Sequence, residues 1–159
     1  MAGTERIARM SQNIDLLRRM YDAWNREGLE AFETLRDCID PAVESVEPPE
    51  FPGGGTYIGV GAWRAAMTQQ LEGWDKIQFE PQQFLENDDK VMAATRVLTR
   101  GRSTQIETEW VIFHVMTVRQ DRIVRFMSFF QRTPALEELG LPADEPVRAI
   151  PPRSESTLS

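Results

Sequence analysis

The sequence predicts an α+β fold, a cone-shaped α+β barrel in which a curved antiparallel β-sheet wraps around a long N-terminal helix and two further helices. Two patterns carry this prediction: helix-spaced apolar stripes fill most of the first 75 residues, and from about residue 76 the apolar residues alternate with a period of two. Helices grouped against one face of an antiparallel sheet are typical of the α+β class. The helices and the sheet should enclose an apolar cavity, the usual kind of small-molecule site.

Three helices are expected in the first 75 residues. The first is indicated by one apolar stripe with alternating steps of three and four, at Ile7, Met10, Ile14, Leu17, Tyr21 and Trp24. Gly28 is expected to cap it. A short helix follows with Leu29, Phe32 and Leu35 on one face, and it ends before Asp40-Pro41. A third helix should run from about Ala62 to Trp74.

The strands are predicted from alternation and from the turns that separate them. A short strand at 42–48 places Val43, Ser45 and Glu47 on one face, and the Pro- and Gly-rich stretch 48–59 is expected to be a loop. Longer strands are expected at 76–85, 90–100, 105–118 and 122–132, the last two joined by the polar turn 119–122. The stretch 133–140 could form one helical turn.

Composition limits the function classes. The 159 residues suffice for one domain, predicted at 1–140, followed by a Pro-rich tail at 141–159 that should be extended or disordered. The net charge of -7 argues against a nucleic-acid partner. No apolar run approaches the ~20 residues of a membrane span, and the N-terminus lacks a signal-peptide core. With a single cysteine, Cys38, these features predict a cytoplasmic protein without a membrane partner.

Several stretches together resemble one known family. They are "IDLLRRMYDAWNREGLEAF", the Asp-Pro before a short strand, "FPGGGTYIG", and "FHVMTVRQDRIVRF". They are similar to the SnoaL-like family of the nuclear transport factor 2-like and ketosteroid isomerase-like superfamily, over about residues 10–140. The resemblance implies the cone-shaped fold, and commonly a homodimer through the outer sheet face. Members include polyketide cyclases, steroid isomerases, dehydratases, epoxide hydrolases and binding proteins without chemistry, so the fold does not decide the function.

The resemblance also implies an acid or base inside the cone. Ser45 stands where ketosteroid isomerases have a catalytic aspartate, and Glu47 lies two residues on, on the same face. His114 matches the strand histidine of SnoaL-type cyclases, but Ser128 stands at the position of their acid. Arg96 lies on a strand suited to the epoxide hydrolases' Arg-x-Asp motif, but that motif's aspartate is absent. For each of these three reaction types, at least one of the family's catalytic residues is absent from this sequence.

His114 is the only histidine in the chain, and it lies in the strongly apolar stretch 108–118. Alternation places it on one face with Trp110, Ile112 and Met116. It could be a buried structural residue with one satisfied hydrogen bond. It could also be a general acid or base at the floor of a pocket, since an unperturbed pKa of ~6.5 lies near working pH.

Two further residues are candidate catalytic groups. Glu47 is either a solvated carboxylate at the rim or an inward base that pairs with His114 or removes a proton beside a carbonyl. Arg96 is either a surface charge or a donor to a substrate oxygen. The candidate substrate-binding residues are Tyr21, Trp24, Trp63, Trp110, Phe126, Ser128 and Phe130. Such aromatic walls suit a flat, polycyclic or aromatic ligand.

Two functions follow from these residues. The first is a cofactor-independent enzyme that isomerises, cyclises or dehydrates a hydrophobic, polyketide- or steroid-like small molecule. The second is a non-catalytic protein of the same fold that binds a small molecule or dimerises. No metal site is expected, because one histidine and one distant cysteine give no ligand cluster.

Overall fold

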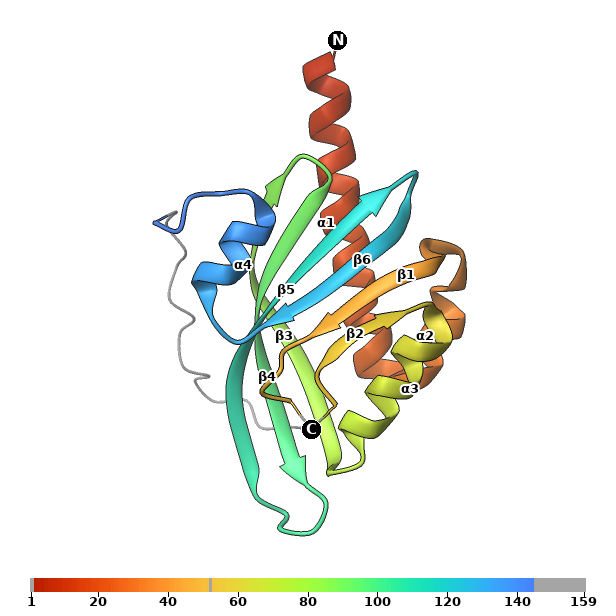
Figure 1. Cartoon of the computed structure of the whole chain (residues 1–159), viewed down its shortest axis with the longest axis vertical. Helices are drawn as coiled ribbons and strands as arrows, with labels where there is room; N and C mark the ends of the chain where they lie inside the picture. The colour runs from red at the N-terminus through yellow and green to blue at the C-terminus, as the bar shows by residue number, and fades with distance from the viewer. Residues whose placement is uncertain (1, 52, 145–159) are drawn as a thin grey trace.

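The structure is a computed structural model that describes residues 2–51 and 53–144, with side chains from residue 12 onward (Figure 1). Its helices are α1 (Ala2–Glu27), α2 (Ala31–Thr34), α3 (Val60–Leu71) and α4 (Arg132–Leu139), with single 3-10 turns at Gly28–Glu30 and Arg36–Cys38. Its strands are β1 (Ile39–Glu47), β2 (Gly55–Ile58), β3 (Trp74–Asn87), β4 (Lys90–Gly101), β5 (Glu107–Arg119) and β6 (Arg122–Phe129). The predicted α+β class is confirmed.

The six strands form one sheet in the order β2-β1-β6-β5-β4-β3. All neighbours are antiparallel except β1 and β6, which run parallel, so the sheet is mixed rather than wholly antiparallel. The chain leaves β1 through β2 and α3, crosses to the far edge at β3, and returns through β4 and β5. This return brings β6 beside β1, and the two strands run in the same direction. Their pairing connects β1 and β2 to the four-stranded part of the sheet formed by β3 to β6.

The stretch predicted to be a loop at 48–59 contains strand β2. Its prolines end before Gly55, and from there Tyr57 pairs with Ser45 on the edge of the sheet. Gly59 then turns the chain into α3 with φ +94°, and its N–H donates to the carbonyl of Val43. The third helix ends earlier than predicted, and Trp74 begins β3 instead of ending α3.

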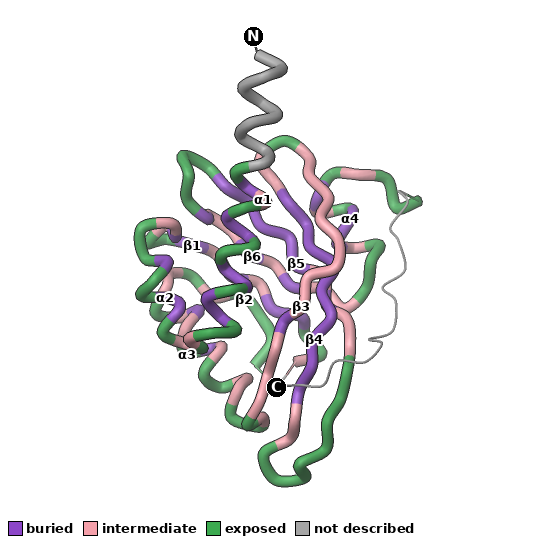
Figure 2. Tube along the Cα trace, turned by 180° about the vertical axis from the view of Figure 1, so that it is seen from behind, coloured by how far each residue is buried: buried purple, intermediate pink, exposed green. Residues whose placement is uncertain are grey.

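The helices lie on opposite faces of the sheet. Figure 1 shows α4 in front of the strands, and Figure 2, from behind, shows α1 in front of them. The main core lies on the α1 side and includes Leu17, Trp63 and Phe126. A smaller core on the other side packs Leu136 of α4 against Val115 of β5. The face of β5 that points away from the main core is therefore covered in part by α4. This helix has 8 residues, about twice the single turn predicted.

Contacts at the C-terminal end hold α4 in place. Lys90 Nζ donates to the carbonyl of Glu138 at 2.9 Å, and Asn87 Nδ2 donates to that of Leu139 at 3.0 Å. Gly140 ends the helix in the left-handed region, with φ +86°. Of the predicted tail, residues 141–144 form turns, and 145–159 lie outside the described residues. None of the helices described is long and apolar enough to cross a membrane.

Candidate functional site

Three neighbouring strands bring the predicted polar residues to the inner face of the cone. Alternation turns Glu47 of β1, Ser128 of β6 and His114 of β5 inward, where all three are buried. Ser128 lies directly opposite His114 in the antiparallel ladder. Val46 pairs with Met127 in the parallel ladder, so the next residues, Glu47 and Ser128, are also neighbours. The strand register thus places Ser128 between the carboxyl group and the imidazole.

These residues line one cavity between the sheet and α3. The full lining is Trp24, Glu47, Phe51, Trp63, Met67, Gln70, Leu71, Trp74, Ile77, Phe79, Trp110, Ile112, His114, Phe126 and Ser128. The cavity volume is about 40 Å³. Pockets for drug-sized ligands have roughly 300–1,000 Å³. A ligand larger than a few atoms can therefore enter only if lining side chains move.

His114 is held from behind by a chain of two hydroxyl groups. Thr95 Oγ1 donates to Tyr21 Oη at 3.0 Å, and Tyr21 Oη lies 2.6 Å from His114 Nδ1. Since Tyr21 accepts from Thr95, its own proton is directed at Nδ1, and the ring proton of a neutral His114 is then on Nε2. Burial lowers the pKa of His114 to about 3. Burial also raises the pKa of Tyr21, so both groups are neutral near pH 7.

Glu47 is not the solvated rim carboxylate that one interpretation of the sequence allowed. It is only 6% exposed, and burial raises the pKa of its carboxyl group. The side chains of Gln70, Ser128 and Ser45 oppose that shift, because their polar groups lie beside the carboxyl and favour its ionised form. Within the described chain, however, Ser45 Oγ and Gln70 Nε2 are buried with no hydrogen-bond partner of normal geometry.

The walls of the cavity are aromatic. At the closed end, Trp63 stacks on Phe126 with centroids 5.2 Å apart, and the His114 ring lies 4.9 Å from Phe126. At the other end, the Phe51 ring packs edge-on against Phe130 at 4.6 Å and against Trp110 at 5.8 Å. We call the group Phe51, Trp74, Trp110 and Phe130 the aromatic mouth. It brings together the β1–β2 loop, β3, β5 and the end of β6.

Most of the predicted substrate-binding residues line this cavity. Those that do are Trp24, Trp63, Trp110, Phe126 and Ser128. Tyr21 lies behind His114, and Phe130 packs against Phe51 and Trp110. Sequence reasoning missed Gln70, although it follows Met67 by three residues on the apolar stripe of α3. It also missed Thr95 and Phe51; no periodic signal marks Phe51, because it lies in an irregular loop.

Arg96 is not brought to the candidate site. On β4 the residues that face the cone are Thr95 and Val97, so the side chain between them points to the outer face. There its Nε lies 2.8 Å from a carboxylate oxygen of Glu109, and its Nη1 lies 3.4 Å from one of Glu80. The expectation that Arg96 supplies a donor inside the pocket is therefore wrong.

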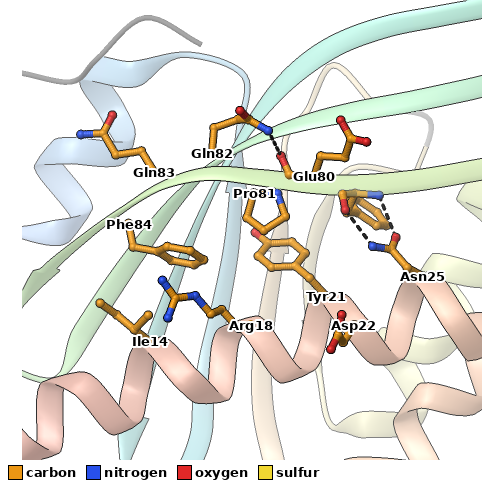
Figure 3. Close-up of a pocket in the computed structure, with 11 residues that line it drawn as sticks. Ile14, Arg18, Tyr21, Asp22, Asn25, Glu80, Pro81, Gln82, Gln83 and Phe84 are labelled. Atoms are coloured by element: carbon orange, nitrogen blue, oxygen red, sulfur yellow. Dashed lines mark hydrogen bonds between the residues drawn. The ribbon is translucent and has the colours of Figure 1, made fainter. Parts of the chain in front are cut away.

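A second, larger hollow lies between α1 and β3. This open groove has a volume of about 790 Å³. Figure 3 shows the residues that line it, with the Arg18 guanidinium facing the Phe84 ring at 4.8 Å from its centroid and the Tyr21 side chain reaching from α1 toward β3. Asn25 holds the edge of β3 by donating to the carbonyl of Phe79 at 2.7 Å and accepting from its N–H at 2.8 Å. Arg18 and Asp22 in the groove are exposed and Glu80 is partly exposed, whereas the cavity combines burial with titratable groups. The cavity is thus the better candidate site.

The family comparison agrees with this fold. The chain belongs to the SnoaL-like domain family, whose model matches residues 17–126. A search of curated proteins found no significant sequence match.

Many solved structures share the fold. TerC co-crystallised with polyporic acid is 21% identical with a TM-score of 0.65, covering 80% of this chain and 96% of that one. A putative SnoaL-like polyketide cyclase from Jannaschia sp. CCS1 is 12% identical with a TM-score of 0.66, covering 84% and 94%. A hypothetical protein from Catenulispora acidiphila DSM 44928, with a ketosteroid isomerase-like fold and bound trimethylamine, is 14% identical with a TM-score of 0.62, covering 83% and 97%.

Proposed function

We propose that this protein is a cofactor-independent enzyme that isomerises, cyclises or dehydrates a hydrophobic carbonyl compound. The reaction begins with removal of a proton from the carbon next to the carbonyl group. The observation that carries the proposal is the pairing of Glu47, whose pKa is raised, with a neutral His114 in one apolar cavity. When the surroundings shift the pKa values of two neighbouring titratable groups in opposite directions, one group can act as the base and the other as the proton donor.

Glu47 is the general base in this proposal. Its carboxylate takes the proton from the substrate carbon, and later returns that proton to another atom of the same molecule. A raised pKa makes the ionised carboxylate a stronger base than a solvated one. The lining around it is mostly apolar, which strengthens its electrostatic effect on a bound substrate.

His114 is a hydrogen-bond donor rather than a base. A pKa of about 3 leaves its ring neutral, and Nδ1 already accepts from Tyr21. Its Nε2–H is therefore the group that can donate to the substrate carbonyl oxygen, which becomes an enolate oxygen when Glu47 removes the proton. Tyr21 and Thr95 are positioning residues, because they fix the ring's tautomer and do not reach the cavity themselves.

The substrate class follows from the walls and from relatives of the same fold. Flat ring compounds suit a cavity lined by Trp24, Trp63 and Phe126. TerC, which shares the fold, was co-crystallised with polyporic acid, and this supports a ring compound as ligand. Because the cavity holds only about 40 Å³, we infer that substrate enters when the aromatic mouth opens at Phe51.

The test is deuterium exchange into 2-tetralone in D2O, followed by proton NMR at the positions next to its carbonyl. Wild-type protein should accelerate the exchange, and Glu47→Gln and His114→Gln should each reduce the acceleration about 10²- to 10⁴-fold while the protein stays folded. Glu50→Gln, which changes an exposed carboxylate in the neighbouring loop, should have no effect. Undiminished exchange in Glu47→Gln would refute the proposal.

A non-catalytic binding protein is the second candidate. It is favoured by the serines at positions 45 and 128, where catalytic relatives carry acids. In that case a ring ketone should bind equally well to His114→Gln, and it should be recovered without deuterium after incubation in D2O. Finding the exchanged ketone with wild-type protein alone would exclude this candidate.

We also propose a homodimer through the part of the outer face that α4 leaves open. Val111 and Met127 lie half-buried there, beyond the segment of β5 that Leu136 covers. Light scattering after size-exclusion chromatography should give twice the mass of the 18.2 kDa chain. A monomer at micromolar concentration would contradict this part of the proposal.

A further inference from the structure

Gln70 stands apart from the other α3 residues that line the cavity. Its neighbours in the lining, Trp63, Met67 and Leu71, form the apolar stripe that packs the helix against the cone. Gln70 lies on the same side, in the last turn of α3, and carries an amide into this stripe. A helix needs no amide there for packing, since a leucine or methionine would fill the same space.

The donor end of this amide is buried but unused. No acceptor in the described residues meets Gln70 Nε2 with hydrogen-bonding geometry. A buried donor without a partner destabilises the folded protein, so such groups call for an explanation. The amide lies close enough to Glu47 to lower the pKa of its carboxyl, yet the contact lacks the geometry of a full hydrogen bond.

Glu47 is close to two polar side chains of the cavity lining. The Gln70 amide comes from α3, and the Ser128 hydroxyl comes from β6, where Ser128 is directly opposite His114 in the ladder. Two different elements thus bring a donor to the cavity that holds the base, the amide from α3 and the imidazole from β5.

We infer that Gln70 is a specificity-determining residue that donates to a second oxygen of the substrate, separate from the carbonyl oxygen held by His114. The inference rests on the proposed function, and it narrows the substrate to compounds with oxygen on both sides of the carbon that loses its proton. Such a ligand satisfies the buried amide, whereas a compound with one oxygen leaves it unpaired. The discrimination should be about tenfold, the effect of one net hydrogen bond of up to about 1.5 kcal/mol.

The experiment compares two ring ketones that differ by one hydroxyl group, 1-indanone and 3-hydroxy-1-indanone, by titration calorimetry. Wild-type protein should bind the hydroxy ketone about tenfold more tightly. Gln70→Met keeps the volume and removes the amide, so it should abolish this preference while leaving 1-indanone affinity within twofold. Gln69→Met changes the exposed neighbour on the same helix, and it should keep the preference.

A purely structural role for Gln70 predicts a different result, because its loss would weaken both ketones equally. An unchanged preference in Gln70→Met, or no preference in wild type, overturns the inference. The proposed function survives that result if Glu47→Gln still abolishes exchange into 2-tetralone. If neither ketone binds to wild-type protein, and 2-tetralone does not exchange, both the proposed function and the role of Gln70 fail.

Discussion

Tyr21 Oη lies 2.6 Å from Nδ1 of His114, and this contact joins the long helix α1 to the middle of the sheet. Because Thr95 also donates to the same hydroxyl, Tyr21 has one proton left to give, and the imidazole receives it. The only histidine in the chain is thereby fixed as a neutral ring that accepts on one side and donates on the other. The contact supports the structural interpretation of His114, and it is compatible with the donor role that we propose, so the two sequence-based interpretations do not exclude each other.

Replacing Tyr21 with phenylalanine should separate these two roles. The variant keeps the ring that packs against Phe79 and Trp24 and loses only the hydroxyl group. We expect the free energy of unfolding to fall by about 1–2 kcal/mol, because Nδ1 and Thr95 lose a buried partner. Exchange into 2-tetralone should fall about tenfold or more, since the tautomer of His114 is no longer fixed.

Nitrogen-15 NMR of the single histidine reports the tautomer directly. In wild-type protein the proton should be on Nε2, and in Tyr21→Phe a mixture of tautomers should appear. Tyr57→Phe removes the only other tyrosine hydroxyl, which binds the carbonyl of Gly53 in the β1–β2 loop, and should leave the signals unchanged. A proton on Nδ1 in the wild type would contradict the assigned roles.

His114 should make stability depend on pH in the acid range. Its pKa is about 3 in the folded protein against 6.5 in the unfolded chain, so only the unfolded chain takes up this proton between those values. The contribution to stability is therefore complete above pH 6.5 and is lost as pH falls toward 3, and the total loss in the free energy of unfolding is about 5 kcal/mol. Urea unfolding of wild type and His114→Gln from pH 3.5 to 7 should show curves that converge as pH falls. A constant difference between them would show that the ring is not desolvated.

Glu47 should have the opposite dependence. Its pKa is raised in the folded protein, so its favourable contribution is present below the unfolded value of 4.5 and is lost as pH rises through the folded value. At pH 8 the buried carboxylate should be a net cost, and Glu47→Gln should stabilise the protein by about 1–2 kcal/mol while exchange activity is lost. At pH 4 the gain should nearly vanish. A variant that is less stable than wild type at pH 8 would mean that the carboxylate is well solvated or paired.

The sequence predicts the elements of the fold better than it predicts which residues line the cavity and how distant segments pair. Periodicity predicted α1, α3 and the hairpin β5–β6, whereas Ser128 became a candidate through the family resemblance and an inward Glu47 was only one of two interpretations. The resemblance also suggested a pocket role for Arg96, and alternation could not test it because residues 91–99 of β4 are all buried, so neither face of that strand reads as the outer one. The parallel pairing of β1 with β6, the short edge strand β2 and the position of Phe51 depend on how distant segments meet. No local pattern encodes these contacts.

Because Arg96 points to the outer face, we expect its replacement to change the stability of the protein but not its exchange activity. Arg96→Met should lower the free energy of unfolding by about 1–3 kcal/mol, because its side chain is only 7% exposed and it pairs with Glu109 and Glu80. Exchange into 2-tetralone should stay within twofold of wild type, measured on protein shown to be folded by circular dichroism. Arg100→Met, which removes a more exposed ion pair with Asp75, serves as the control. A selective loss of activity in Arg96→Met would return this residue to the site.

The aromatic mouth makes the last prediction, since a cavity of about 40 Å³ admits a ring only after a side chain leaves. Phe51 lies in the loop between β1 and β2, so it can move without disrupting the sheet. Phe51→Ala should raise the association rate of 1-indanone about tenfold in stopped-flow fluorescence of the nearby tryptophans. Phe84→Ala removes an equally half-buried phenylalanine beside the groove, and it should leave that rate unchanged. Equal rates in wild type and Phe51→Ala would mean that ligands reach Glu47 by another path, because the ring at the mouth would then be no barrier to entry.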